Sequence, residues 1–299
     1  MKKLIVRIAE GLGNQMFMYS HSYSLSKKLN YTLFIDNTSG YFKSKNQIRN
    51  FELNYFNISG QLSEKKFKFD TYAKDIKRKI LKKTDSFRKK KNFLIEQVAA
   101  NKFTCFTDYT KYQYSDLLFT EGHFECEKYF SEYSQDIKKQ FLIKKEFIDE
   151  KNPYINLLKN TNSVSICIRQ NRYSEGRIPS KKKSYQFTVD TINYVKKSIN
   201  YFKNKIENPK FFIWSNDFDG LSDHFNINEF TFIENKNNQS INDFNLFKYA
   251  KHFIVGPTPF HWWGSWLNEN PDKICLRPSN INPSNNRDFW PEKWIDVSL

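Results

Sequence analysis

The sequence predicts an α/β protein with two Rossmann-like domains, each built on a parallel sheet. Apolar runs of strand length alternate with helical patterns in both halves of the chain, which is typical of βαβ units. The length of 299 residues suits two domains, since a domain commonly has about 100 to 200 residues. In such sheets ligands bind beyond the carboxyl ends of the strands, so we expect a cleft between the domains to hold the ligand.

The chain opens with a βαβ unit. Leu4–Ile8 is an apolar run of strand length, and a turn at Gly11–Gln15 leads into a helix that ends near Leu29. Small and apolar residues recur on one face of this helix. Thr32–Ile35 then predicts a second strand, so a parallel sheet begins the first domain, which we expect over residues 1–155.

Residues 74–91 form a strongly basic segment. They contain ten basic and two acidic residues, a local charge of +8 and half of the net +16. Ile76, Ile80, Leu81 and Phe87 follow helical spacing, which predicts a basic amphipathic helix. Two interpretations stay open: a helix that packs on the protein through this stripe, or a helix drawn to an anionic membrane surface.

A polar stretch near residue 155 precedes a second α/β series, which we expect over residues 156–299. Its strand-length apolar runs are 164–168, 211–214, 230–233, 252–255 and 274–276. The helical patterns between them cover 187–202, 240–250 and 260–268. This alternation predicts a second parallel sheet.

Composition and charge narrow the function. Hydrophobic residues at 39% and aromatic residues at 17% provide a large core and exclude a disordered chain. No run reaches the roughly 18 apolar residues that span a bilayer, and the four cysteines form no C-x-x-C pair. We therefore expect a cytoplasmic protein. A pI near 9.4 favours polyanionic partners: nucleic acid, acidic lipid or a phosphorylated small molecule.

Polar residues gather after the strands. Arg169, Arg172 and Arg177 follow 164–168 and are three of only nine arginines, which favours a diphosphate clamp over a chance ion-pair network. Asp217 follows 211–214, where it could accept hydrogen bonds from a guanine or a ribose. With Asp219 it also forms a D-x-D pattern, although we favour a site without metal.

Two turns are suited to anions. The glycines at Gly11–Gln15 let backbone N–H groups approach a ligand at a helix N-terminus, but Met16 stands where a dinucleotide motif needs a small residue. Thr258 is a favoured N-cap and Pro259 suits a first helical turn. The helix that they begin either binds an anion or is an ordinary capped helix.

Taken in this order, the segments resemble glycosyltransferase family 11, the bacterial alpha-1,2-fucosyltransferases. The Gly-Leu-Gly-Asn-Gln-Met-Phe sequence at Gly11–Phe17 is the most specific part. Phe51–Asn57, Gly122–Phe130 and the tryptophan motif at Phe260–Leu267 add to the resemblance, which covers most of the chain.

The resemblance implies a GT-B architecture, a GDP-sugar donor, inversion at the anomeric carbon, and no metal or other cofactor. It implies that Arg169 holds the donor β-phosphate, that Asn14 lies near the transferred sugar, and that Thr258 lies at the phosphates. Glu175 is the candidate base. The residues expected to bind the donor are Gly11, Gly13, Gln15, Arg172, Arg177, Asp217, Thr258, Phe260 and His261.

The arginine motif departs from the family pattern. Cys167 replaces a His, Gln170 the second Arg, Asn171 a Gly, and Arg172 an Asp. A donor other than GDP-fucose, or a changed grip on the phosphates, is therefore expected to be compatible with this chain.

The sequence thus predicts an inverting, metal-independent transferase that moves fucose, or another GDP-activated sugar such as a heptose, to a hydroxyl of a bacterial capsule or lipopolysaccharide glycan. Residues 1–155 would hold the oligosaccharide or lipid-linked acceptor and residues 156–299 the GDP-sugar. Contact with the inner face of the plasma membrane is one of the two interpretations of the basic segment, and a nucleic-acid partner is not expected. A non-catalytic family member and a nucleic-acid-binding protein are the alternatives.

Overall fold

The computed structural model describes residues 1–298 except 44–48, 175–178, 235–239, 280 and 282–284. Contacts divide the chain into two compact units. The N-terminal unit comprises Met1–Leu142 with Ser284–Phe289, and the C-terminal unit comprises Ile143–Pro283 with Trp290–Leu299. The division after Leu142 precedes the boundary expected at residue 155, and a short late segment returns to the N-terminal unit.

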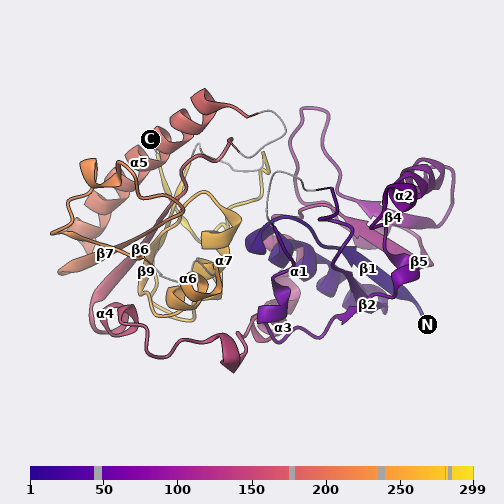
Figure 1. Ribbon diagram of the computed structural model, residues 1–299, viewed down its shortest axis with the longest axis horizontal. Coiled ribbons are helices and arrows are strands. Elements are labelled where there is room, and N and C mark those ends of the chain that lie inside the picture. Colours follow the sequence, from indigo (N-terminus) through magenta and orange to yellow (C-terminus); the bar gives the residue numbers. More distant parts are fainter. Residues whose placement is uncertain (44–48, 175–178, 235–239, 280, 282–284, 299) are drawn as a thin grey trace. The chain divides into compact units, whose positions relative to one another are not determined.

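The N-terminal unit is built on a five-stranded parallel sheet of order β3-β2-β1-β5-β4 (Figure 1). Its strands are β1 (Lys3–Arg7), β2 (Thr32–Asp36), β3 (Gln61–Leu62), β4 (Lys91–Ile95) and β5 (Tyr114–Glu121). Its helices are α1 (Leu12–Leu29), α2 (Tyr72–Asp85) and α3 (Ser134–Gln140). The predicted opening βαβ unit is confirmed.

The two faces of this sheet are covered differently. Phe93 and Phe119 belong to a buried cluster on one face, against which Leu81 of α2 packs. Side chains alternate along a strand, so Thr120 points to the other face, where its hydroxyl lies 2.8 Å from that of Ser22 on α1. Helix α1 therefore covers the second face.

The exposure of side chains on and after helix α2 contradicts one interpretation of the basic segment. Leu81 packs against the buried cluster as expected, but Ile76, Ile80 and Phe87 are exposed. The interpretation that the whole stripe packs on the protein is therefore wrong for these three side chains. The helix also ends at Asp85, and Lys91, the last residue of the segment, begins β4.

The C-terminal unit is built on a six-stranded parallel sheet of order β11-β10-β9-β6-β7-β8. Its strands are β6 (Asn162–Ile168), β7 (Pro209–Ser215), β8 (Phe230–Phe232), β9 (His252–Ile254), β10 (Cys275–Pro278) and β11 (Ile295–Val297). Its helices are α4 (Tyr154–Asn160), α5 (Lys181–Lys205), α6 (Ser240–Phe247) and α7 (Pro259–Leu267).

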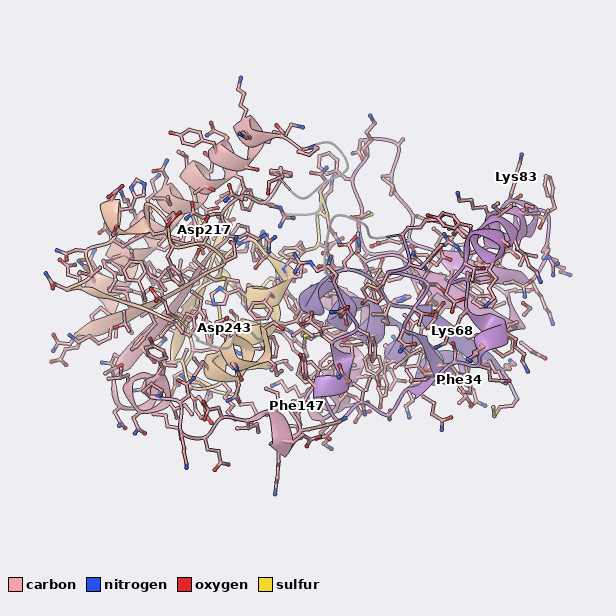
Figure 2. The ribbon with its side chains drawn as sticks, viewed as in Figure 1. Phe34, Lys68, Lys83, Phe147, Asp217 and Asp243 are labelled. Atoms are coloured by element: carbon pink, nitrogen blue, oxygen red, sulfur yellow. The ribbon has the colours of Figure 1, made fainter. Side chains whose placement is uncertain are left out.

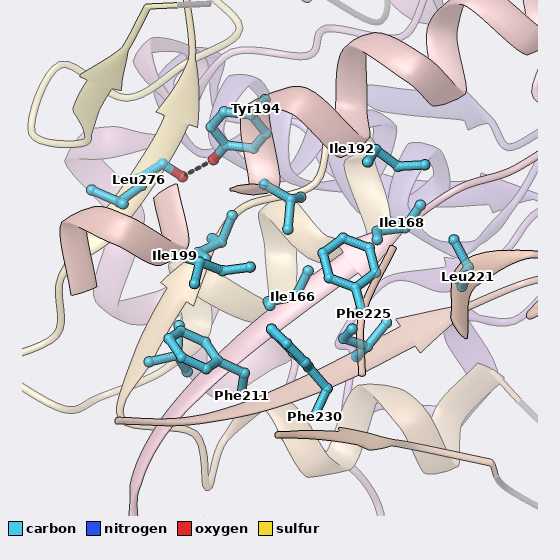
Figure 3. Close-up of a cluster of buried hydrophobic side chains, with 14 of the residues drawn as sticks. Ile166, Ile168, Ile192, Tyr194, Ile199, Phe211, Leu221, Phe225, Phe230 and Leu276 are labelled. Carbon is cyan, nitrogen blue, oxygen red and sulfur yellow. Dashed lines mark hydrogen bonds between the residues drawn. The ribbon is translucent and has the colours of Figure 1, made fainter. Parts of the chain in front are cut away.

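Helices cover both faces of this sheet. Ile166 and Phe211 form one buried cluster with α5, in which Tyr194 donates a 2.7 Å hydrogen bond to the Leu276 carbonyl (Figure 3). On the other face, the Trp214 ring lies 5.0 Å from that of Phe247 on α6. The predicted class, an α/β protein with two parallel sheets, is confirmed. Among the helices of the described residues, none is long and apolar enough to cross a membrane.

Candidate active site

The glycine turn of the N-terminal unit joins β1 to α1 and is fixed by a buried amide. Gln15 donates hydrogen bonds of 2.8 Å to the carbonyls of Glu10 and Asn50, and it accepts one of 2.9 Å from the Glu52 amide. Because these three bonds are internal and the side chain is fully buried, Gln15 positions the turn, and its expected contact with the donor stays a prediction.

Asn14 belongs to a polar group at the start of α1. Its amide donates a 2.6 Å hydrogen bond to one oxygen of Glu10, whose other oxygen lies 3.0 Å from the His123 ring. Glu10 has φ of 62°, a left-handed conformation that residues other than Gly, Asn and Asp seldom adopt. The backbone thus holds a carboxylate beside Asn14, at the carboxyl end of β1. Gly11, the N-cap, is extended with φ of −80°, and Gly13 lies in the first turn of α1.

His123 is held by the loop that follows β5. The Glu96 carboxylate, beyond the end of β4, accepts bonds of 2.7 Å and 3.1 Å from the amides of His123 and Phe124. Gly122 allows this approach, since a Cβ there would lie 2.3 Å from the Glu96 Cβ. The carboxyl ends of β1, β4 and β5, which are neighbours in the sheet, therefore build this polar group together.

The pair of Glu10 and His123 is charged at neutral pH. The hydrogen bond from His123 lowers the pKa of Glu10 below its usual value, against partial desolvation. Desolvation opposes charge on His123, but the bond to Glu10 and the charges of Glu125 and Glu96 outweigh it and raise its pKa to about 9. A carboxylate and an imidazolium thus stand side by side.

The C-terminal unit gathers its candidate residues on three adjacent strands. Thr258 follows β9, Arg169 follows β6, and Asp217 follows β7, and these strands are consecutive in the sheet. Neighbouring strands lie about 4.8 Å apart, so the three residues emerge within a span of about 10 Å. Asp217 is labelled in Figure 2.

Amide side chains tie the loops after β6 and β7 together. The Gln170 side chain donates 2.9 Å bonds to the carbonyls of Asp217 and Asp219, and the Asn171 amide lies 3.2 Å from the Asp217 carboxylate. Gln170, which stands at the second arginine position of the family motif, therefore braces a loop instead of presenting a second cation. Arg169, half-buried beside it, is the cation at this strand end.

The turn before α7 is packed against the end of β6. A Cβ on Gly256 would lie 2.1 Å from the Cys167 carbonyl oxygen, so only glycine allows this approach. Thr258 caps α7 by accepting a hydrogen bond from the His261 amide, with Pro259 in the first turn. The predicted cap is confirmed, and it places the N-terminus of α7 next to the Cys167–Arg169 segment.

His261 holds this turn from inside the protein. Its Nδ1 accepts a 2.9 Å hydrogen bond from the Gly256 amide, and its Nε2 lies 2.9 Å from the Ser165 hydroxyl. Burial lowers its pKa to about 3, so the ring is neutral, and Nε2 carries the proton and donates to Ser165. With both nitrogens bonded internally, His261 positions the turn, and its expected contact with the donor stays a prediction.

The remaining predicted residues differ in their surroundings. The Arg172 guanidinium lies over the rings of Phe187 and Tyr173, at 5.3 Å and 5.8 Å from the ring centres. Phe260 packs beside Phe244 and Phe247 of α6. Glu175 and Arg177 lie outside the described residues.

The acidic pair after β7 is engaged with the backbone. Asp217 accepts a 3.0 Å hydrogen bond from the Asp219 amide, which closes a local turn. Within the part of the chain that the structure describes, no group of three or more His, Cys, Asp or Glu side chains is arranged to hold a metal ion.

Two α/β units, each built on a parallel sheet with polar groups beyond its strand ends, have the architecture of GT-B glycosyltransferases. Residues 3–297 match the family model described as Glycosyl transferase family 11, so the chain belongs to that family. The predicted family and the predicted class of enzyme are thereby confirmed.

Relatives and solved structures agree with this family. An alpha-1,2-colitosyltransferase of Escherichia coli is 28% identical, with 99% of each chain covered. The O-antigen biosynthesis glycosyltransferase WbnK of Escherichia coli is 26% identical over 97% of this chain and 99% of the relative.

Among solved structures, NodZ alpha-1,6-fucosyltransferase soaked with GDP-fucose gives a TM-score of 0.54 at 13% identity, covering 92% of this chain and 94% of the other. A mutant of Arabidopsis thaliana FUT1 in complex with GDP gives 0.52 at 9% identity, covering 94% and 71%. At these identities the likeness shows the fold.

Sequence reasoning did not assign a role to Glu10, Glu96 or His123. Glu10 directly precedes the glycine turn, at the carboxyl end of the first strand, and this position is a signal that could have identified it. No comparable signal marks Glu96, because its partners come from the loop beyond β5.

Proposed function

We propose that the protein transfers a sugar from a GDP-sugar to a hydroxyl of a bacterial surface glycan. The observation that carries the proposal is the convergence of Arg169, Asp217 and the capped start of α7 on three adjacent strand ends. The GDP and GDP-fucose complexes of the structural neighbours and the names of the Escherichia coli relatives support it.

The C-terminal unit would hold the donor. Transfer breaks the bond between the anomeric carbon and the β-phosphate oxygen, so negative charge grows on the diphosphate. Arg169 presents a planar set of donors that matches phosphate oxygens, and the N-terminus of α7 at Thr258 contributes free N–H groups and the positive end of the helix dipole. Asp217 would accept hydrogen bonds from the guanine or the ribose.

The reaction would need no metal in this arrangement. Arg169 and the start of α7 would neutralise the leaving diphosphate, and the acceptor would attack from the opposite face of the sugar and invert the anomeric carbon. Arg172 and Arg177 remain candidate helpers, although Arg172 lies over two aromatic rings.

The N-terminal unit would hold the acceptor and take up its proton. Glu175, the base expected from the sequence, lies outside the described residues. We propose Glu10 instead, because its carboxylate is ionised and lies beside Asn14, which is expected near the transferred sugar. The imidazolium of His123 would stabilise that carboxylate and orient it. The proton leaves the hydroxyl as the new bond to the anomeric carbon forms.

The donor sugar is a further proposal. Gln170 braces a loop where the family motif has a second arginine, which supports a changed grip on the donor. The sugars to test are fucose, a heptose and colitose, the last of which is suggested by the name of one relative. A capsule or lipopolysaccharide glycan is the proposed acceptor, and action at the inner face of the plasma membrane is the proposed location.

Rates of transfer with a panel of GDP-sugars and oligosaccharide acceptors test the donor site. We expect Arg169→Ala to lower kcat by about 100- to 1000-fold, the usual effect of removing one preorganised donor to developing charge. Arg88→Ala, which removes the same charge from an exposed position, is the matched control and should keep its rate. Equal rates for wild type and Arg169→Ala would contradict the assignment.

The same assay tests the proposed base. We expect Glu10→Gln to lower kcat by about a hundredfold with little change in the KM for the donor, since general-base catalysis contributes at least about that factor. Glu64→Gln, at an exposed carboxylate paired with two lysines, is the control. An unchanged kcat in Glu10→Gln would exclude Glu10 as the base and leave Glu175 as the candidate.

The two alternatives are not favoured, because the family match spans nearly the whole chain. Transfer or donor hydrolysis in vitro would exclude a non-catalytic member. A gel shift at moderate salt would test nucleic-acid binding.

A further inference from the structure

Helix α2 presents apolar side chains to solvent and charged side chains to the protein. Tyr72, Ile76 and Ile80 lie four residues apart on one face and are 63%, 58% and 58% exposed. Phe87, just beyond the end of the helix, is 89% exposed. A surface helix of a globular protein normally buries its apolar stripe. We therefore expect a binding partner to cover this exposed stripe.

The inner face of α2 is anchored by ion pairs. Arg78 donates hydrogen bonds of 2.7 Å and 2.8 Å to both oxygens of Glu121 at the end of β5, and it also pairs with Asp75 at 2.8 Å. Lys82 bonds Glu121 at 2.7 Å. These side chains are largely buried, so the network fixes which face of the helix is turned outward.

The end of α2 is anchored as well. The Asp85 carboxylate accepts bonds of 2.9 Å and 3.0 Å from the amides of Asn92 and Phe93 at the start of β4. The helix cannot rotate to bury its apolar stripe without breaking these bonds and the Glu121 network. The stripe therefore faces outward as a property of the fold.

Unpaired lysines surround the stripe. Lys83, labelled in Figure 2, and Lys77 are exposed, and each is three residues from Ile80, so both border the stripe on the helix surface. Lys89 and Lys90, which are also exposed, follow Phe87 in the chain. Within the part of the chain that the structure describes, none of these four exposed lysines pairs with a carboxylate.

We propose that this surface, defined as Tyr72, Ile76, Ile80 and Phe87 with Lys77, Lys83, Lys89 and Lys90, docks on an anionic lipid bilayer. A bilayer interface accepts aliphatic and aromatic side chains at the acyl boundary while its phosphates attract lysines. The bilayer interface therefore complements both the positive charge and the apolar side chains of this surface.

Other partners match it less well. Nucleic acid would attract the lysines, but aliphatic side chains such as Ile76 and Ile80 do not stack on bases. A second copy joined about a twofold axis would set the same basic surface against itself, where like charges repel. The proposal does not depend on the sugar that the enzyme transfers.

Cosedimentation of the whole protein with vesicles tests the proposal. Wild type should bind vesicles that contain phosphatidylglycerol, bind pure phosphatidylcholine much more weakly, and release as salt rises. Lys77→Gln/Lys83→Gln/Lys89→Gln should weaken binding by about a hundredfold. Ile76→Asn/Ile80→Asn should weaken it at least about tenfold while keeping the salt dependence.

A matched control separates this surface from net charge. Lys181→Gln/Lys182→Gln/Lys183→Gln removes the same charge from exposed positions at the start of α5 and should bind as wild type does. Hydrogen exchange of wild type, which needs no variant, should slow in residues 72–90 when anionic vesicles are added.

Several outcomes would overturn the proposal. They are equal binding to neutral vesicles, an equal loss in the α5 variant, and no slowing of exchange in residues 72–90. RNA binding through these lysines without vesicle binding would point to a nucleic-acid partner. A dimer that dissociates in the isoleucine variant, with no vesicle binding, would point to a second copy.

Discussion

The pair of Glu10 and His123 should stabilise the folded protein by an amount that depends on pH. Glu10→Gln, His123→Gln and the double variant form a thermodynamic cycle, and chemical denaturation gives the free energy of unfolding of each. The two charged groups lie 3.0 Å apart, and both side chains are about half-exposed. Solvent screens a pair of this kind, so we expect a coupling of about 1 kcal/mol near neutral pH, well below what the raised pKa of His123 alone would suggest.

The pH dependence follows from the two pKa shifts. The pKa of His123 is raised from 6.5 to about 9, so its contribution to stability is complete below the unfolded value and is lost as pH rises through about 9. The pKa of Glu10 is lowered, so its contribution is present above the unfolded value of 4.5 and is lost as pH falls. The coupling should therefore be largest between these limits and vanish near about pH 10. A coupling near zero at neutral pH, or one that persists unchanged at high pH, would refute the reasoning.

Two further predictions concern the turn before α7. Gly256→Ala should lower the free energy of unfolding by about 3 kcal/mol, because its Cβ would meet the Cys167 carbonyl at 2.1 Å. Gly220→Asn, whose Cβ would meet only open space and one atom at 4.0 Å, should cost less than about 1 kcal/mol, and equal losses in denaturation curves would contradict the packing argument. His261→Phe should cost about 2 to 4 kcal/mol by leaving the Gly256 amide and the Ser165 hydroxyl unpaired, with binding of GDP to the folded variant kept. Weaker GDP binding at unchanged stability would instead place His261 in the donor site.

The sequence predicted the parts of the fold whose signals are local. The buried parallel strands β6 and β7 are continuous apolar runs, and Gly11 and Thr258 mark the helix starts with turn and cap residues. Helix α5 extends beyond its expected range at both ends. The charged Lys181–Lys183 begins it, where apolar periodicity has no signal.

The parts that could not be predicted depend on partners distant in the sequence. Gln15 was expected at the donor because of its motif, but its amide is used by Asn50 and Glu52. Spacing identified α2 as a helix, yet the side turned outward is decided by Glu121, at the end of a strand far along the chain. Periodicity cannot show which face a non-local ion pair selects.

The proposed diphosphate grip of Arg169 is tested most directly by calorimetric titration of GDP and GMP into wild type and Arg169→Ala. If Arg169 holds the β-phosphate, wild type should bind GDP at least about tenfold more tightly than GMP, because the charge-assisted bonds to that phosphate are lost in GMP. Arg169→Ala should lose most of this preference and keep only the part that the N-terminus of α7 contributes. A variant that keeps the full preference for GDP would contradict the account.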